Sequence, residues 1–273
     1  AFTFVENGEE QRVIARYTYA VNNKGKITMN EKSSTKEIVS SAAELFAEDA
    51  GAGLENVTPE DLIIPQLKIA QKTSKEVDAN DGSYLPGIQV GDIMNNITGE
   101  LYRSDKGITV VPIAYKRVFL EFKPREVGGG FIALHENPGI LSETTRTKGL
   151  DLLASGNYIQ TTANHYVLLV EDGKAVPVMI AMSSTQLKKS RRWLANMTSI
   201  RRTTKDGMSY TPASYSHVYQ LTTVPEKNDK GSWYGWKIDM LSEVEDVALY
   251  NQAKAFAATV NEPQLTESED VPF

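Results

Sequence analysis

The order of elements expected between Gly107 and Val260 constrains the fold of this chain more than any other feature. Runs of β-branched, aromatic and alternating residues predict strands in this region, and turn residues separate them. The predicted strands cover residues 108–122, 166–170, 176–182, 214–223 and 232–240. A tight turn at Glu171-Asp172-Gly173-Lys174 joins the second and third of them into a hairpin. We therefore expect a mainly β domain of the α+β class with antiparallel strands.

The clearest helix of the chain lies between the third and fourth of these strands. Leu187, Leu194 and Met197 recur at helical spacing, with Trp193 and Ile200 beside the stripe. The hydroxyl residues at 183–185 are expected to cap its start. A five-stranded oligonucleotide-binding (OB) barrel also has its helix between the third and fourth strands. The order is thus compatible with an OB-fold-like antiparallel barrel, although other barrels and α+β folds share it.

The rest of the chain predicts an extension, added helices and a tail. Residues 1–57 read as an N-terminal extension, with a hairpin around Asn22-Asn23-Lys24-Gly25 and a short helix from Ser33 to Phe46. Thr58 and Pro59 start a helix and open a core over residues 58–260. A capping box of Ser242 and Glu245 is expected to begin a last helix that ends near Val260. Residues 261–273 read as an acidic, disordered tail.

Composition limits the environment of the protein. With 41% hydrophobic residues among 273, the chain can bury a substantial core. Its apolar runs fall short of the roughly 18–20 residues that span a bilayer, and its first residues do not resemble an export signal. The lack of cysteine excludes disulfides, thiolate-bound zinc and a cysteine nucleophile. A cytoplasmic location is expected, in the host cytoplasm if the protein is viral.

Charge is distributed unevenly along the chain, although the net charge of −6 suggests an acidic protein. Between Ala181 and His217 there are seven basic residues and a single acidic one, Asp206. From Leu241 to Phe273 there are seven acidic residues and a single basic one, Lys254. A concentrated basic segment permits binding to a polyanion, because phosphates respond to local charge.

Single-stranded nucleic acid needs cations along its backbone and aromatic faces for its unstacked bases. The basic segment supplies the first set of candidate phosphate contacts: Lys188, Lys189, Arg191, Arg192, Arg201, Arg202 and Lys205. A second set lies in and after the 108–122 strand: Lys116, Arg117, Lys123 and Arg125. The candidate stacking rings are Trp193, Tyr210, Tyr215, Phe119 and Phe122. The alternative is that individual rings belong to the core and that the charged helix face is merely solvated.

Enzymatic interpretations find little support in the sequence. The three histidines, His135, His165 and His217, are far apart and have no metal-binding spacing. Gly128-Gly129-Gly130 lacks the Gly-Lys-Ser/Thr ending of a phosphate-binding loop, and there is no Gly-x-Ser-x-Gly nucleophile elbow. We therefore expect a protein that is not an enzyme, without catalytic residues, metal or cofactor.

The last residues carry a resemblance to a known family. Glu269, Asp270, Val271, Pro272 and Phe273 form an acidic segment that ends in Pro-Phe. This segment resembles the C-terminal tip of single-stranded DNA-binding proteins of bacteria and bacteriophages. The resemblance implies that these five residues bind partner proteins of DNA replication, recombination or repair. A charged tail with an apolar end is suited to docking in a partner's pocket or in a basic groove.

Together these features predict a bacteriophage-type protein that coats and protects single-stranded DNA and recruits partners through its tail. The missing Gly/Pro/Gln-rich linker, the larger core and the N-terminal extension depart from the bacterial pattern, so a monomer or homodimer is expected. The alternatives are a non-enzymatic phage interaction protein (a particle component or a transcription modulator) and a strand-annealing recombination protein. A nuclease assembled from distant acidic residues is also compatible with the sequence.

Overall fold

The computed structural model describes residues 46, 49–56, 63–171, 173–229 and 231–261, together with four strands within residues 2–29. The chain divides into two compact units, Ala1–Leu62 and Ile63–Phe273. The helices expected from Ser33 and from Thr58 lie essentially outside the described residues, and so does the tail from Glu262 onward.

The first unit contains two antiparallel hairpins. In the first hairpin β1 (Phe2–Glu6) pairs with β2 (Glu9–Val13). In the second, β3 (Tyr19–Val21) pairs with β4 (Ile27–Met29). This second pairing confirms the hairpin expected around residues 22–25.

The second unit is built on an antiparallel sheet of eight strands. Its strands are β8 (Ile108–Phe122), β9 (Phe131–His135), β10 (Thr145–Thr147), β11 (Leu150–Leu152), β12 (Tyr158–Glu171), β13 (Lys174–Ser183), β16 (His217–Asn228) and β17 (Gly231–Glu243). The five strands predicted from periodicity are confirmed as β8, β12, β13, β16 and β17. The mainly β, antiparallel α+β class is therefore confirmed.

Smaller elements complete this unit. A three-stranded sheet contains β5 (Leu67–Ile69), β6 (Ile93–Asn95) and β7 (Leu101–Tyr102), and β14 (Arg202–Thr203) pairs with β15 (Ser209–Tyr210). The α-helices are α2 (Leu187–Ser199) and α3 (Val247–Asn261). The 3-10 helices are η2 (Lys75–Val77), η3 (Arg125–Val127), η4 (Pro138–Glu143), η5 (Ser184–Gln186) and η6 (Ser214–Ser216).

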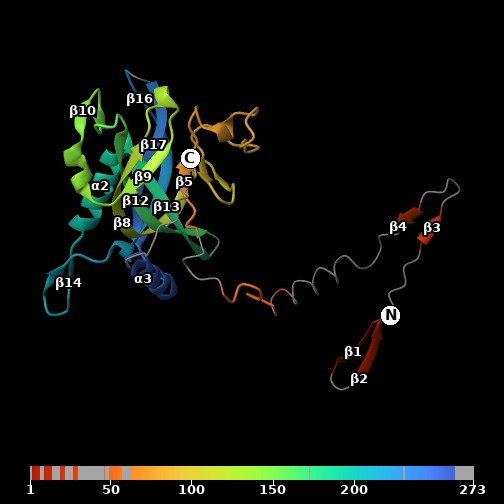
Figure 1. The fold of residues 1–273 in the computed structure, drawn as a ribbon. Helices are drawn as coiled ribbons and strands as arrows, with labels where there is room; N and C mark the ends of the chain where they lie inside the picture. The colour runs from red at the N-terminus through yellow and green to blue at the C-terminus, as the bar shows by residue number, and fades with distance from the viewer. Residues whose placement is uncertain are drawn as a thin grey trace. The chain divides into compact units, whose positions relative to one another are not determined.

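The long strand β8 lies at the centre of the large sheet. It pairs with β12 along most of its length, while β16 pairs with its first residues and β9 with its last ones. The main strands therefore lie in the order β13-β12-β8-β16-β17, and α2 connects β13 to the β14–β16 segment. The connection from β8 to β12 carries β9, β10 and β11 (Figure 1).

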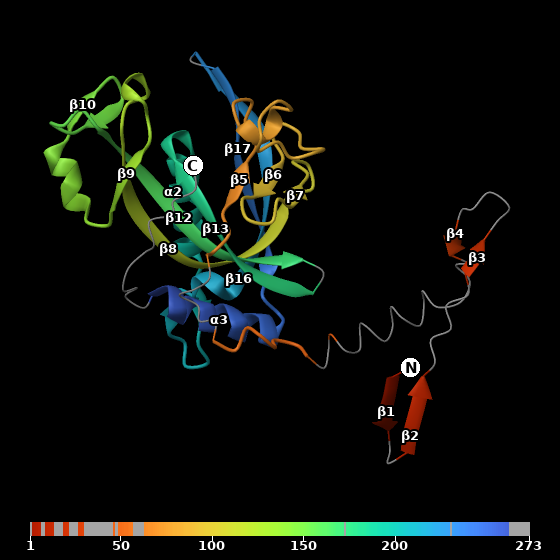
Figure 2. The ribbon, with the colours of Figure 1, turned by 45° about the vertical axis from the view of Figure 1, so that its right-hand side comes forward.

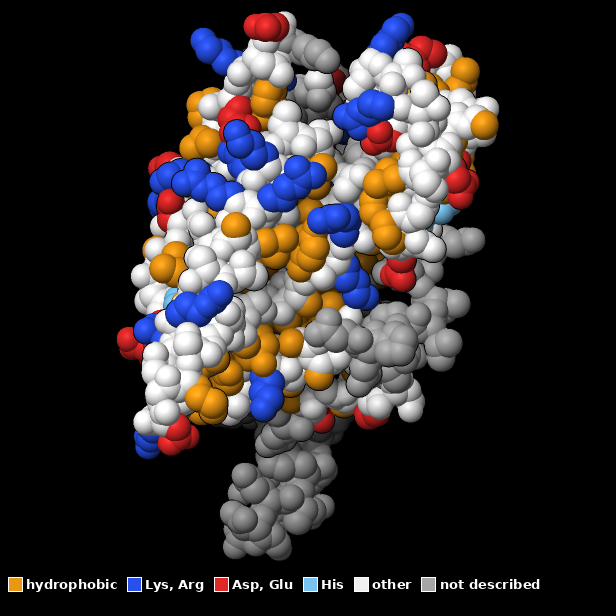
Figure 3. Space-filling model, turned by 90° about the vertical axis from the view of Figure 1, so that its left-hand side faces the viewer, with side chains coloured by type: hydrophobic (Ala, Val, Ile, Leu, Met, Phe, Trp, Pro, Cys, Tyr) orange, Lys and Arg blue, Asp and Glu red, His pale blue; other side chains and the backbone are white. Residues whose placement is uncertain are grey.

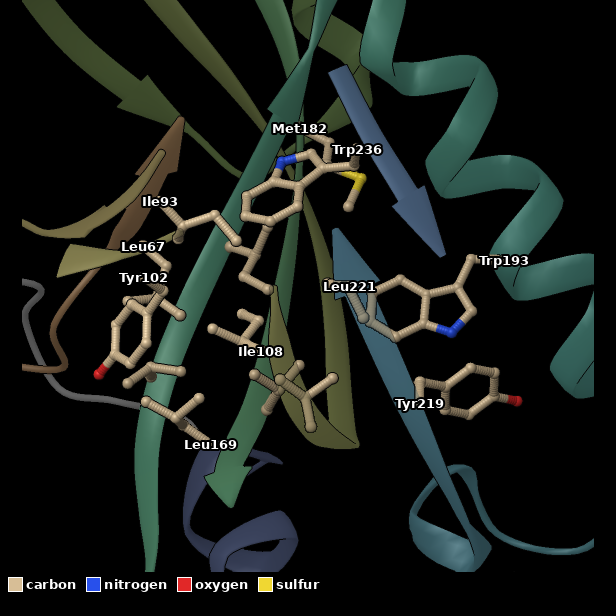
Figure 4. Close-up of a cluster of buried hydrophobic side chains, with 14 of the residues drawn as sticks. Leu67, Ile93, Tyr102, Ile108, Leu169, Met182, Trp193, Tyr219, Leu221 and Trp236 are labelled. Atoms are coloured by element: carbon tan, nitrogen blue, oxygen red, sulfur yellow. The ribbon is translucent and has the colours of Figure 1, made fainter. Parts of the chain in front are cut away.

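Two apolar clusters hold α2 and α3 on the sheet. Trp193 of α2 packs with Val110, Ala163 and Tyr219 of three different strands. Figure 4 shows Trp193 and Tyr219 side by side below α2, with Leu67 and Tyr102 on the far side of the same cluster. On the other face of the sheet, α3 packs on Val111, Ile113 and Leu168 through Ala253 and Ala257. Successive residues of a strand point to opposite faces, so the sheet is buried on both sides.

The β5–β7 sheet lies at the open side of the large sheet, beside β13 and β17 (Figure 2). Met179 N–H donates to the Pro65 carbonyl at 2.8 Å, next to an isolated parallel bridge between Gln66 and Met179. The Gln71 amide bonds both backbone groups of Tyr234 in β17, at 2.9 Å each. Within the described residues β13 and β17 share no ladder, so the sheet does not close into a hydrogen-bonded barrel.

Two of the expected helix starts differ in the structure. Ser184 has a positive φ of 49° and lies in the 3-10 turn η5, and no hydroxyl caps α2, which begins at Leu187. The last helix is capped by Asp246, whose Oδ1 accepts from Ala248 N–H at 2.7 Å. The expected capping box of Ser242 and Glu245 is wrong because β17 continues through Glu243, which leaves Ser242 inside the strand.

Candidate nucleic-acid interface

The exposed side of α2 carries cations without partners. Ser190 and Trp193 are buried against the sheet, which places Lys188, Arg191 and Arg192 on the outward side. All three are exposed, and within the described part of the chain none of them makes an ion pair. These three side chains are therefore available to an anionic ligand.

Three other predicted phosphate contacts already have partners. Lys189 forms an ion pair with Glu226 and donates to the Trp236 carbonyl at 2.6 Å. Arg202 pairs with Glu243. Arg201 donates to the carbonyls of Thr198 and Ile200 and to Thr211 Oγ1, at 2.6, 3.0 and 2.7 Å. Lys189 stabilises the fold, whereas the two arginines are exposed and would have to exchange partners to bind phosphate.

The cations of the β8 segment point in different directions. Arg117 is opposite Ala163, which lies in the α2-side cluster, whereas Lys116 is opposite Asn164 on the other face. Arg117 is exposed and donates to the Tyr115 hydroxyl at 3.3 Å, and Lys116 is half-buried. Lys123 and Arg125 are exposed after the strand, and Lys205 is exposed in the β14–β15 turn. Lys116 and Arg117 therefore cannot contact the same stretch of a nucleic-acid backbone. Of these two residues, Arg117 lies on the face that carries α2.

Two of the predicted stacking rings are core residues, and their prediction as stacking residues is wrong. Trp193 is 2% exposed and Phe119 is 1% exposed. Trp193 stacks on His165 at a centroid distance of 4.7 Å and meets Tyr219 edge-on at 5.6 Å. A base cannot stack on rings that are almost completely buried.

The other three rings remain partly accessible. Tyr210 is 47% exposed at the end of β15, and Tyr215 is half-buried edge-to-face against Tyr250 of α3. Phe122 is half-buried and stacks on Tyr158 at 5.6 Å. Phe131 completes this ring cluster by meeting Phe122 edge-on at 5.9 Å. Of the five predicted rings, Tyr210 and Phe122 offer the better surfaces for a base.

The side of the unit that carries α2, β10 and β14 has many basic side chains. Figure 3 views this side, which lies on the left in Figure 1, and shows Lys and Arg side chains gathered around a strip of hydrophobic side chains. Cations around apolar surface suit a ligand that combines phosphates with rings.

A polar strip crosses β8, β12 and β13 on the face opposite α2, and the sequence did not reveal it. The ladder places Lys116, Asn164 and Ala181 in one row, and Val118, Thr162 and Ser183 in the next. Asn164 is 9% exposed, and its side-chain oxygen has no hydrogen-bond partner among the described residues. This oxygen is itself buried, and a buried acceptor without a donor is unfavourable for folding.

A network of side chains provides hydrogen-bond partners for polar groups at the free edge of β17. Gln186 Oε1 accepts from Trp236 N–H at 2.9 Å, and Glu226 accepts from Trp233 Nε1–H at 2.8 Å. Burial raises the pKa of Glu226, but the hydrogen bonds from Lys189 and Trp233 outweigh burial, so this pKa lies below its ordinary value. A Cβ atom at Gly235 would come within 3 Å of the ends of the Glu226 and Gln186 side chains, so a larger residue there would displace this network.

The described residues contain no group of three or more His, Asp or Glu side chains that could bind a metal ion. Among the same residues, no helix combines the length and the apolar character needed to cross a bilayer. The predicted partner-binding residues, Glu269 to Phe273, lie outside the described residues.

Comparison with known proteins gives one significant similarity. A family model described as Pam3 phage gp34-like protein matches residues 32–266. No curated protein and no solved structure matches the chain significantly. The family match covers most of the 273 residues and includes β5 to β17, α2 and α3. The chain therefore belongs to the Pam3 phage gp34-like protein family.

Proposed function

We propose that this phage-family protein binds single-stranded DNA through an OB-fold core and has no catalytic activity. The observation that carries the proposal is the strand order β13-β12-β8-β16-β17 with α2 after β13. If β8, β12, β13, β16 and β17 are strands one to five, this order corresponds to an OB barrel that is open between strands three and five. The long first strand shared by both halves and the helix between strands three and four fit the same topology.

The positions of the cations support a nucleic-acid ligand. In OB folds oligonucleotides contact the face of strands two and three and the loops between strands one and two and between strands four and five. In this chain the corresponding face is β12–β13, which carries the polar strip beside Lys116. The corresponding first loop is the long β8–β12 connection, with Lys123 and Arg125 at its start.

Single strands are favoured over duplexes because the candidate site combines rings with cations. Phe122, Phe131 and Tyr158 form a partly exposed cluster at one end of the β8–β12 face, and Lys116 lies on the same face. Stacking of one base on an aromatic side chain contributes about 1–3 kcal/mol and requires a base that is not already stacked in a duplex. Lys188, Arg191 and Arg192 lie on the α2 side of the sheet, so they would contact phosphates of a strand that continues beyond this face, and they would add affinity without sequence preference.

The acidic tail fits a recruiting role in this proposal. Glu269 to Phe273 would compete with DNA for the basic side when no DNA is present, and would be released for replication or recombination proteins when DNA binds. Residues 1–240 carry no net charge, because residues 241–273 account for the whole net charge of −6. The proposal includes action as a monomer or homodimer in the host cytoplasm.

A protection assay tests the proposed function. A labelled poly-thymidine strand is incubated with the full chain and then with a nuclease specific for single strands. The proposal predicts protection that rises with protein concentration, no cleavage by the protein itself with or without divalent metal, and no displacement of bound strand by equimolar duplex. Cleavage by the protein would indicate a nuclease, and equal competition by duplex would contradict single-strand specificity.

A further inference from the structure

The strands β5 and β13 begin a parallel ladder and then separate. Their isolated bridge joins Gln66 to Met179, and among the described residues it is the single bridge between these two strands. If the same register continued, Lys68 would pair with Ala181 and the next pair would involve Ser183. The ladder stops instead, and a pocket of about 160 Å³ opens between the two strands, bounded at its far end by Tyr234 and Trp236 of β17.

The edges of this pocket expose backbone hydrogen-bonding groups. Met179 N–H points toward β5, and the period of two in a strand directs the backbone groups of Ala181 and Ser183 the same way. On the other side, Gln66 and Ala70 bond toward β6, so the groups of Leu67 and Ile69 face β13. The parallel bridge of Gln66 with Met179 uses the Leu67 N–H, which leaves the Leu67 carbonyl and the backbone groups of Ile69 at the pocket. Each of these four residues lines the pocket. Backbone groups at a partly enclosed site require partners, which a ligand with its own donors and acceptors can supply.

The side chains around the pocket suit a planar polar ring. Ile69 and Tyr234 are half-buried and give the lining its apolar floor and its aromatic wall, while Leu67 and Trp236 are almost completely buried. Gln66 and Ser183 lie at the rim, and no hydrogen bond of either side chain occurs with the described residues. The rim also contains Lys68, and desolvation by burial lowers the pKa of its ammonium group.

We propose that this pocket binds a single nucleobase of the DNA strand, with the backbone edges of β5 and β13 hydrogen-bonding to the edge of the base. This inference rests on the proposed function, because the pocket would be one subsite of the β12–β13 face that is proposed to bind DNA. The pocket adjoins the polar strip, because Ala181 and Ser183 are the cross-strand neighbours of Asn164 and Thr162. A strand that follows the strip would therefore bring a base to the opening.

The size of the pocket favours a base over a peptide. Pockets for drug-sized ligands occupy about 300–1,000 Å³, so a space of about 160 Å³ admits one ring system rather than several residues of an extended chain. An inorganic phosphate alone would leave the apolar floor and the Tyr234 wall without contacts. The Lys68 ammonium at the rim fits the phosphate or sugar attached to the base.

Amide NMR of the full chain tests the subsite directly. The probes are thymidine monophosphate and deoxyadenosine monophosphate at millimolar concentrations, with deoxyribose 5-phosphate and inorganic phosphate as controls. We expect the amide signals of Leu67, Ile69, Ala181 and Ser183 to shift with the nucleotides and to stay in place with both controls. Shifts of the same size with inorganic phosphate would overturn the base pocket in favour of a phosphate site.

A matched pair of substitutions links the pocket to strand binding. Ala181→Leu enlarges a residue that lines the pocket, whereas Val176→Leu adds bulk at an exposed position of the same strand. We expect Ala181→Leu to abolish the nucleotide shifts and to weaken single-strand affinity about tenfold, since one stacked base contributes 1–3 kcal/mol. Val176→Leu should leave both unchanged.

The outcomes separate the two proposals. If the wild-type chain binds single strands but the four amide signals do not respond to nucleotides, the base pocket is wrong and the proposed function stands. If the wild-type chain binds neither single strands nor nucleotides, both are wrong. The wild-type titration does not depend on a variant, so a misfolded Ala181→Leu chain would still leave a decisive result.

Discussion

At the scale of single residues, long polar side chains cap the edge strand β17 where a barrel would close. Gln71, Gln186 and Lys189 bond the backbone of Tyr234 and Trp236, and Glu226 holds Lys189 in place. An open edge strand exposes unpaired backbone groups that invite association with other chains. These side chains therefore protect the open side of the sheet without closing it.

Glu226→Ala should destabilise the second unit. The substitution removes the partner of Lys189 and the acceptor of Trp233 Nε1–H, and it leaves both groups partly buried. We expect the free energy of unfolding to fall by about 1–3 kcal/mol, the usual effect of leaving such groups unsatisfied. Urea denaturation measures this change, with Glu245→Ala at an exposed position as the control. Equal stability of the two variants would show that the edge network contributes nothing.

His165 should make the stability depend on pH. Burial lowers its pKa to about 4 from 6.5, because the ring stacks on Trp193 and lies 2.8 Å from Ser190 Oγ in the core. The unfolded chain takes up a proton below pH 6.5, and the folded chain does so only near pH 4, so stability falls as pH decreases through this window. The loss should be on the order of 3 kcal/mol.

Urea titrations of the wild type and of His165→Gln across this pH range test that expectation. The variant keeps a polar partner for Ser190 but does not titrate, so its stability should depend less on pH. Identical pH profiles of the two proteins would assign the acid sensitivity to other groups with a lowered pKa, such as His217 or Glu121.

Residue roles were the least predictable feature. Trp193 was expected beside the apolar stripe, yet with Ser190 it forms the buried centre of α2. The pairing of Lys189 with Glu226 and of Arg202 with Glu243 joins residues about 40 positions apart, and single-sequence patterns do not reveal such pairs. Exposed cations on a helix could be identified from periodicity, but their ion pairs could not.

At the scale of elements, the long strands and α2 could be predicted from the sequence, whereas the short elements could not. Strands β8, β12, β13, β16 and β17 have 10 to 15 residues, long enough for a repeating pattern. Strands β5, β6 and β7 have two or three residues and appeared as a loop-rich region. Such short strands are defined by their neighbours, so the pocket between β5 and β13 could not be foreseen.

The exposed face of α2 should control the electrostatic part of DNA binding. Changing Lys188, Arg191 and Arg192 to Gln removes three possible phosphate contacts while the buried side of the helix is kept. The slope of log affinity against log salt should become shallower by about 2, since each neutralised phosphate contributes about 0.7 on single strands. The matched control changes Lys75, Lys106 and Lys254, which are exposed on other elements, to Gln. Equal effects of both triple variants would assign binding to overall charge.

At the scale of the whole molecule, the chain combines a body that has one basic side with an acidic C-terminal segment. Deletion of Glu269 to Phe273 should preserve or tighten DNA binding, because a competing anion is removed, and should abolish binding of partner proteins. Anisotropy titrations and pull-down with replication proteins of the host measure the two effects. Weaker DNA binding after the deletion would contradict the competitor role.

The central claim is that this chain holds unpaired DNA through phosphate and base contacts. The most direct measurement is a titration of the full chain with a single-stranded and a double-stranded oligonucleotide of equal length at two salt concentrations. The account predicts tighter binding of the single strand at both concentrations, and an affinity for it that falls as salt rises. Equal affinity for both oligonucleotides, or binding of neither at low salt, would contradict it.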